Sequence, residues 1–126
     1  MSERLLLDTH VLLSWLAGAP ISREAGEAIA DPSNAVAVSA ASIWEITIKR
    51  QVGTLRFEGS PADVVRDAGF EHLSITAAHA ELAGDLPLRH RDPFDRMLVA
   101  QARTDGWTVV SRDAAFTLYD VRLLAC

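Results

Sequence analysis

Four acidic residues lie just after predicted strands or in the opening turns of predicted helices. Asp8 directly follows the apolar run Arg4–Leu7, Asp113 follows a second apolar run, and Glu45 and Asp95 lie within predicted helices. Carboxylates gathered at one edge of a fold repel one another unless a cation is present. Mg²⁺ prefers such oxygen ligands, and it can lower the pKa of an attacking water and stabilise the leaving oxygen of a phosphodiester.

Glu45 is the acid furthest from the start of its helix. Counted from Ser39 as the cap, it lies roughly 9 Å along the axis at about 1.5 Å per residue. Helical side chains lean toward the N-terminus, and glutamate is one methylene longer than aspartate. We therefore expect Glu45 to reach the same edge as the three aspartates, from a mostly apolar stretch of helix.

Each acid also has a structural interpretation. Asp8 and Asp113 stand where an N-cap is needed. Glu45 precedes Lys49 by four residues, a spacing that stabilises an exposed helix. Asp92 also precedes a predicted helix, and we interpret it as a cap and not as a ligand. These interpretations explain the acids singly but not their expected convergence.

The elements that would position these acids alternate between strands and helices. Strands are predicted at residues 4–7, 35–38, 72–75, 108–111 and 121–124. Helices are predicted at residues 9–18, 21–30, 39–51, from 60 onward, 76–84 and 92–104. Such alternation predicts an α/β fold with a central parallel β-sheet flanked by α-helices, in which ligands bind beyond the carboxyl ends of the strands.

Composition predicts one globular domain spanning residues 1–126. Apolar residues make up 49% of the chain and charged residues 23%, and the formal net charge is −5. A protein that binds nucleic acid through a broad cationic surface would be basic, so bound cations or a basic partner would have to offset these acids. With a single cysteine, Cys126, and no apolar run of membrane-spanning length, we expect a cytoplasmic protein without a disulfide or membrane association.

Four segments of this chain resemble the four acidic blocks of PIN-domain proteins, and most closely those of VapC-type toxins. They occur in the family's order and spacing over essentially the whole chain. The segments are Leu6–Leu7–Asp8–Thr9–His10, Ser42–Ile43–Trp44–Glu45–Ile46, Asp92–Pro93–Phe94–Asp95–Arg96 continuing to Ala102, and Val110–Ser111–Arg112–Asp113. The block that begins at Asp92 is the most specific of them.

This resemblance implies a Mg²⁺-dependent endoribonuclease, with Mn²⁺ as an alternative metal. It also implies that the chain is the toxin of a type II toxin–antitoxin pair. Its partners would be an antitoxin protein and RNA, and it would form homodimers or a complex with the antitoxin. By position, Asp8, Glu45 and Asp95 match the family's core acids and Asp113 the variable fourth. The same match suggests metal-binding and catalytic roles for these four residues.

Several neighbours of the acids are weaker candidates. Thr9, Arg96 and Ser111 are predicted to contact substrate, and Ser111 is also a candidate to share the role of Asp113. His10 and His90 are interpreted as solvated residues, because neither has a second histidine at ligand spacing. The tryptophans Trp15, Trp44 and Trp107 follow apolar patterns and are expected in the core or in dimer contacts.

Three other functions were weighed. A phospho-accepting signalling domain would need paired acids after the first strand and a lysine after the last, but Asp8 is alone and Lys49 is the only lysine. A phosphatase with an aspartyl nucleophile would usually have a second aspartate at position 10, which is His10. The third alternative, a catalytically silent PIN-fold interaction module, stays open.

Overall fold

Five parallel strands form the centre of the molecule. The computed structural model describes residues 2–126. In chain order the strands are β1 (Arg4–Leu7), β2 (Ala35–Ser39), β3 (Glu71–Leu73), β4 (Thr108–Ser111) and β5 (Arg122–Ala125). Their order across the sheet is β3-β2-β1-β4-β5, with every neighbouring pair parallel. The predicted α/β fold with a parallel sheet is confirmed.

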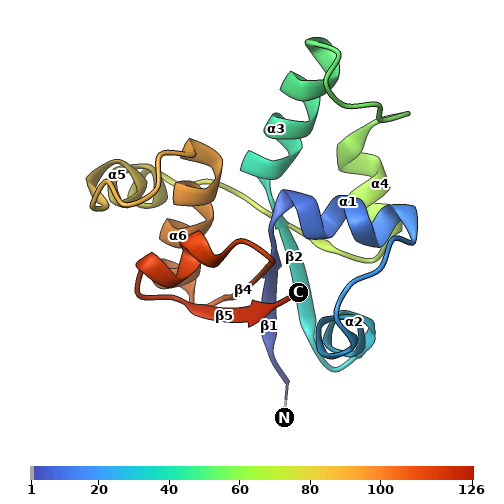
Figure 1. Ribbon diagram of the computed structural model, residues 1–126, viewed down its shortest axis with the longest axis horizontal. Coiled ribbons are helices and arrows are strands. Elements are labelled where there is room, and N and C mark those ends of the chain that lie inside the picture. Colours follow the sequence, from blue (N-terminus) through green and yellow to red (C-terminus); the bar gives the residue numbers. More distant parts are fainter. Residues whose placement is uncertain (1) are drawn as a thin grey trace.

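Helices cover both faces of this sheet (Figure 1). They are α1 (Thr9–Ala17), α2 (Arg23–Ala30), α3 (Ala40–Gln51), α4 (Pro61–Asp67), α5 (Ala77–Asp85) and α6 (Pro93–Asp105), with a 3₁₀ turn η1 (Ala114–Leu118). Helices α1, α2 and α4 contribute to the core on one face, whereas α6 and η1 contribute to the core on the other. No helix in residues 2–126 is long and apolar enough to cross a membrane.

Strand β1 lies at the middle of the sheet and is buried on both faces. Leu5 and Leu7 pack into one core with Val11, while Leu6 packs into the other with Leu98. The three leucines are fully buried, and each such burial contributes roughly 2 kcal/mol to stability. This central strand ends at Asp8, so its packing fixes where that carboxylate lies.

Polar residues cap the helices where the chain leaves the strands. Asp8 caps α1, Ser39 caps α3, Asp92 caps α6 and Asp113 caps η1, each by accepting a backbone N–H. Such caps satisfy amide groups that have no partner within their helix. The cap assignments predicted from sequence for Asp8, Asp92 and Asp113 are therefore confirmed.

The predicted element boundaries differ from the observed ones by one or two residues. The third strand was expected at residues 72–75 but spans Glu71–Leu73, because the chain turns toward Thr76, which caps α5. The last strand, expected at residues 121–124, is Arg122–Ala125. Neither shift moves an acid of the expected site.

Candidate metal centre

The candidate site lies where β1 and β4 end side by side. The two strands are paired in parallel, and the backbone N–H of Asp8 donates to the carbonyl of Val110 at 3.1 Å. After β1 the chain moves to β2 on one side of the sheet, whereas β4 lies on the other side. Ligands in open α/β sheets bind at such a reversal, outside the carboxyl ends of the strands.

Asp8 is a buried carboxylate held by two bonds. Its Oδ1 accepts the N–H of Val11 at 2.8 Å, and its Oδ2 accepts the hydroxyl of Ser111. Only 3% of the residue is exposed. Burial raises the pKa of Asp8, the two hydrogen bonds oppose that rise, and the nearby charge of Asp113 adds to it.

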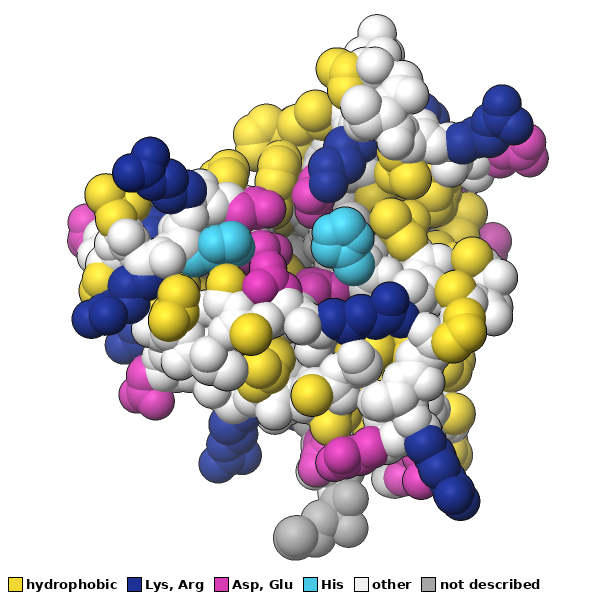
Figure 2. All heavy atoms as spheres, in the orientation of Figure 1, with side chains coloured by type: hydrophobic (Ala, Val, Ile, Leu, Met, Phe, Trp, Pro, Cys, Tyr) yellow, Lys and Arg dark blue, Asp and Glu magenta, His cyan; other side chains and the backbone are white. Residues whose placement is uncertain are grey.

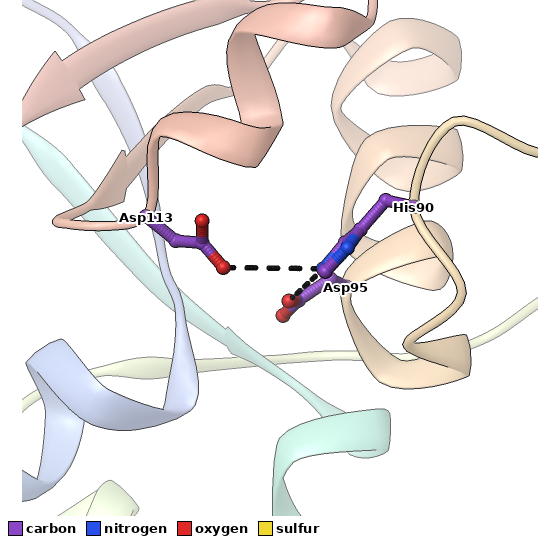
Figure 3. A group of neighbouring side chains, drawn as sticks. All are labelled: His90, Asp95 and Asp113. Carbon is purple, nitrogen blue, oxygen red and sulfur yellow. Dashed lines mark hydrogen bonds and ion pairs between the residues drawn. The ribbon is translucent and has the colours of Figure 1, made fainter.

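Asp95 lies in the first turn of α6, beneath the loop that precedes this helix. Its Oδ2 is 2.8 Å from Nε2 of His90, as Figure 3 shows. Burial raises the pKa of Asp95 to about 6; the His90 hydrogen bond opposes this shift, and the charges of Asp92 and Asp8 reinforce it. A nearby cation stabilises the charged form of a carboxyl in such an environment.

Asp113 faces the same ring nitrogen of His90 as Asp95 does (Figure 3). Its Oδ1 accepts the N–H of Ala115 at 2.8 Å, and its Oδ2 is 3.9 Å from Nε2 of His90. Its own N–H donates to the Ser111 hydroxyl at 2.9 Å. Ser111 therefore links Asp8 to Asp113 across the ends of β1 and β4.

Glu45 lies on α3, three residues after Ser42. Its Oε2 is 2.7 Å from Nζ of Lys49, and only 7% of its side chain is exposed. The hydroxyl of Thr9 donates to that of Ser42 at 3.0 Å, which ties the first turn of α3 to the start of α1 beside Asp8. The structure thus contains the Glu45–Lys49 pair expected from their spacing, but with the carboxylate buried.

The surface over these residues is hollowed and charged. Figure 2 shows acidic side chains gathered near the centre of this face, between two histidine side chains, with lysine and arginine side chains farther out. A hollow of about 400 Å³ is lined by Asp8, His10, Leu13, Ser14, Arg112 and Asp113. It gives a ligand access to Asp8 and Asp113 together.

The donor set suits a divalent cation. Among residues 2–126, three side chains place one potential ligand atom each within 4.8 Å of one another, namely His90, Asp95 and Asp113. Asp8 lies outside this group but is joined to Asp113 through Ser111. Glu45 also lies outside it. Of the four expected acids, Asp95 and Asp113 belong to this compact group, whereas Asp8 and Glu45 lie outside it.

Arg96, which the sequence predicts to contact substrate, points into the protein in this structure. Arg96 is 7% exposed, and its guanidinium donates to backbone carbonyls of Ala83, Leu86 and Pro87. Buried charged groups need such partners, so Arg96 supports the loop between α5 and α6. Thr9 and Ser111 are buried as well, and their hydroxyls bond to protein groups and not outward.

Two other expectations change. The sequence favours a solvated loop position for His90, but its Nε2 lies 2.8 Å from Asp95 and 3.9 Å from Asp113. Its position five residues before Asp95 was the available signal, although sequence spacing alone does not bring a loop over a helix. Trp44 is 62% exposed and meets the ring of Phe94 edge-on at 5.6 Å, which excludes the core and leaves the dimer contact as the expectation for it.

Comparison with known proteins supports this arrangement at the level of the fold. The family model described as PIN domain matches residues 5–121. VapBC2 from Rickettsia felis bound to a promoter DNA fragment matches with a TM-score of 0.74 and 14% identity over 98% of each chain. FitAcB from Neisseria gonorrhoeae matches with a TM-score of 0.65 and 22% identity, covering 95% of this chain and 96% of that one.

A DNA-bound VapBC from Salmonella typhimurium matches with a TM-score of 0.67 and 14% identity over 98% of each chain. A search of curated protein sequences gave no match. At these identities the solved structures are similar to this chain in fold alone. The family model, however, covers nearly all of the chain, including Asp8, Glu45, Asp95 and Asp113, so the chain belongs to the PIN domain family.

Proposed function

We propose that this protein is a metal-dependent endoribonuclease. The observation that carries the proposal is the meeting of Asp8, Asp95 and Asp113 at the ends of β1 and β4, with the pKa values of Asp8 and Asp95 raised by burial and by neighbouring acids. Membership of the PIN domain family supports nuclease chemistry at this position. The choice of RNA as substrate rests on the resemblance to VapC-type toxins.

Some residues of the site would bind a cation, and others hold those ligands in position. Asp8, Asp95 and Asp113 would hold Mg²⁺ or Mn²⁺, with Glu45 as a further carboxylate beside them. When bound, the cation supplies a Lewis acid that lowers the pKa of the attacking water and offsets phosphate charge. Ser111 and the backbone N–H of Val11 orient Asp8. Hydrolysis by water would leave a 5′-phosphate and a 3′-hydroxyl without a covalent enzyme intermediate.

The first test is cleavage of RNA by the purified protein in the presence of Mg²⁺ or Mn²⁺. Asp8→Asn and Asp95→Asn each keep the shape of the side chain but remove a charged ligand, so we expect cleavage to fall by about a hundredfold or more, an effect of several kcal/mol on the transition state. Asp63→Asn is the matched control, because Asp63 is an exposed aspartate on α4 whose carboxylate pairs with Arg66.

Sequencing the ends of the RNA fragments would identify the products and the target. Undiminished cleavage by Asp8→Asn or Asp95→Asn, or full activity in excess EDTA, would contradict the proposal. A well-folded chain that binds a partner but cleaves no RNA under any metal would support the alternative, a catalytically silent PIN-fold interaction module.

We further propose that the protein is the toxin of a type II toxin–antitoxin pair and acts in the cytoplasm. Support comes from the fold it shares with chains of VapBC and FitAB complexes. The partner would be an antitoxin protein, and the chain would form homodimers or a complex with that antitoxin. Its basic side chains would offset the carboxylates of Asp8 and Asp95, which burial and repulsion make costly to leave charged.

Co-expression decides this second part. Induction of the wild-type chain alone should slow growth, whereas co-expression with the product of the neighbouring reading frame should restore it and give a stable complex. Asp8→Asn should bind that product without harming growth. The absence of both a complex and growth rescue would remove the antitoxin from the proposal and leave the nuclease assay unaffected.

A further inference from the structure

The imidazole of His90 faces two carboxylates of the site through one ring nitrogen. Its Nε2 is 2.8 Å from Oδ2 of Asp95 and 3.9 Å from Oδ2 of Asp113 (Figure 3). The ligand atoms of the three side chains all lie within 4.8 Å of one another. His90 is therefore placed as the two aspartates are, facing the same small volume.

The loop that carries His90 is held in place by buried groups. The Arg96 guanidinium donates to the carbonyls of Leu86 at 2.9 Å, Pro87 at 3.1 Å and His90 at 3.4 Å. The Tyr119 hydroxyl donates to the carbonyl of Pro87 at 2.8 Å and accepts the N–H of His90 at 3.0 Å. Arg96 and Tyr119 are 7% and 8% exposed, so the backbone of His90 is fixed from the interior.

Two of the separations among these side chains are close to those of ligands around one ion. With metal–ligand distances of about 2.1 Å, adjacent ligands of an octahedral ion lie about 3.0 Å apart and opposite ligands about 4.2 Å apart. The His90–Asp95 distance of 2.8 Å is close to the first value and the His90–Asp113 distance of 3.9 Å is close to the second. The ligand atoms of Asp95 and Asp113 lie within 4.8 Å of each other, so the three side chains can close around one ion by side-chain movement alone.

The type of ligand atom limits which ion this is. Mg²⁺ favours oxygen ligands and keeps several waters, whereas imidazole nitrogen is a good ligand for divalent transition-metal ions. Mn²⁺ accepts carboxylate oxygen and imidazole nitrogen in the same site. A site that holds two carboxylates and one imidazole thus favours Mn²⁺ over Mg²⁺.

We propose that His90 is a metal ligand together with Asp95 and Asp113, and that it makes this centre selective for Mn²⁺ over Mg²⁺. The inference rests on the proposed function only in taking the two aspartates as metal ligands; it does not depend on RNA being cleaved. A purely positioning role for His90, in which it only steadies the Asp95 carboxylate, is the competing outcome.

Electron paramagnetic resonance of Mn²⁺ bound to the full-length protein tests the ligand directly. The echo modulation of ¹⁴N in the Mn²⁺ spectrum reports a coordinated nitrogen. We expect it in the wild type and in His72→Gln, the matched control at an exposed histidine that contacts the Ala62 carbonyl. His90→Gln, whose amide can still hydrogen-bond Asp95, should abolish it.

Metal affinity gives the second measurement. Even loss of a group that only supports a metal ligand costs about tenfold or more in affinity, so His90→Gln should weaken Mn²⁺ binding by at least this factor. Mg²⁺ binding should change by less than about twofold, since Mg²⁺ gains little from imidazole. Melting curves should show that His90→Gln and His72→Gln are folded.

Two results would overturn the inference. A wild-type spectrum without ¹⁴N modulation would show that no histidine coordinates the ion. Equal weakening of Mn²⁺ and Mg²⁺ by His90→Gln would assign His90 to positioning Asp95. Nitrogen coordination without RNA cleavage would uphold this inference and contradict the proposed nuclease, whereas cleavage without nitrogen coordination would do the reverse.

Discussion

At the scale of one residue, the buried carboxyl of Asp95 makes the stability of the fold depend on pH. Its pKa is raised to about 6 in the folded protein, mainly by burial, from an ordinary value of 3.8. The folded state thus favours the protonated form. This contribution to stability is fully present below pH 3.8 and is lost as the pH rises through about 6.

We expect Asp95→Asn to make the metal-free protein more stable at pH 7 than the wild type. At about 1.4 kcal/mol per pKa unit, the gain is at most about 3 kcal/mol. Urea unfolding in EDTA from pH 4 to pH 8 would measure it. The stability of Asp95→Asn should fall less with rising pH than that of the wild type, and Asp63→Asn should follow the wild type. Parallel curves for Asp95→Asn and the wild type would contradict this expectation.

At the scale of elements, Arg96 joins helix α6 to the end of α5 and the loop that follows. Its guanidinium donates to carbonyls of Ala83, Gly84, Leu86, Pro87 and His90. The carbonyls at a helix C-terminus lack partners within their own helix. One buried side chain thereby satisfies the end of α5 and fixes the loop that carries His90.

Arg96→Lys should therefore lower the free energy of unfolding by about 2 to 4 kcal/mol. The ammonium group keeps the charge but cannot reach the same set of carbonyls, and buried acceptors that lose a charged donor are costly. Urea unfolding measures the change. Arg103→Lys, on the exposed side of α6, is the control and should lose less than about 0.5 kcal/mol. An Arg96→Lys protein of normal stability but weakened RNA cleavage would restore the role of a substrate contact.

Elements were predictable from sequence where local chemistry decides them. Apolar runs identified the strands, and a capping residue before each helix located Asp8, Asp92 and Asp113 correctly. The loop before α6 was not predictable in this way. His90 faces Asp95 because Arg96 and Tyr119 hold the loop from inside the fold, and Tyr119 lies far from His90 in the sequence. Contacts of that kind leave no local pattern.

At the scale of the whole molecule, the sheet order explains how acids spread over the chain meet. Strand β1 pairs with β2 on one side and with β4 on the other, so Asp8 and Asp113 become neighbours despite their separation in sequence. The parallel sheet was expected from the alternation of strands and helices. The strand order was not, because local patterns do not specify which strands pair. Because the net charge of the protein is −5, its own basic residues do not balance its acids. We therefore expect cations or a basic partner to offset the charge of Asp8, Asp95 and Asp113.

Asp8 and Asp113 are both N-caps, and this double use bears on how such a protein can change over generations. Asparagine and serine cap helices about as well as aspartate. A single substitution to either residue would therefore remove a carboxylate from the centre and keep the cap that begins α1 or η1. Lineages of this chain can thus lose a carboxylate of the centre by one substitution, Asp8→Asn or Asp113→Asn, while still producing a folded protein on which selection can act anew.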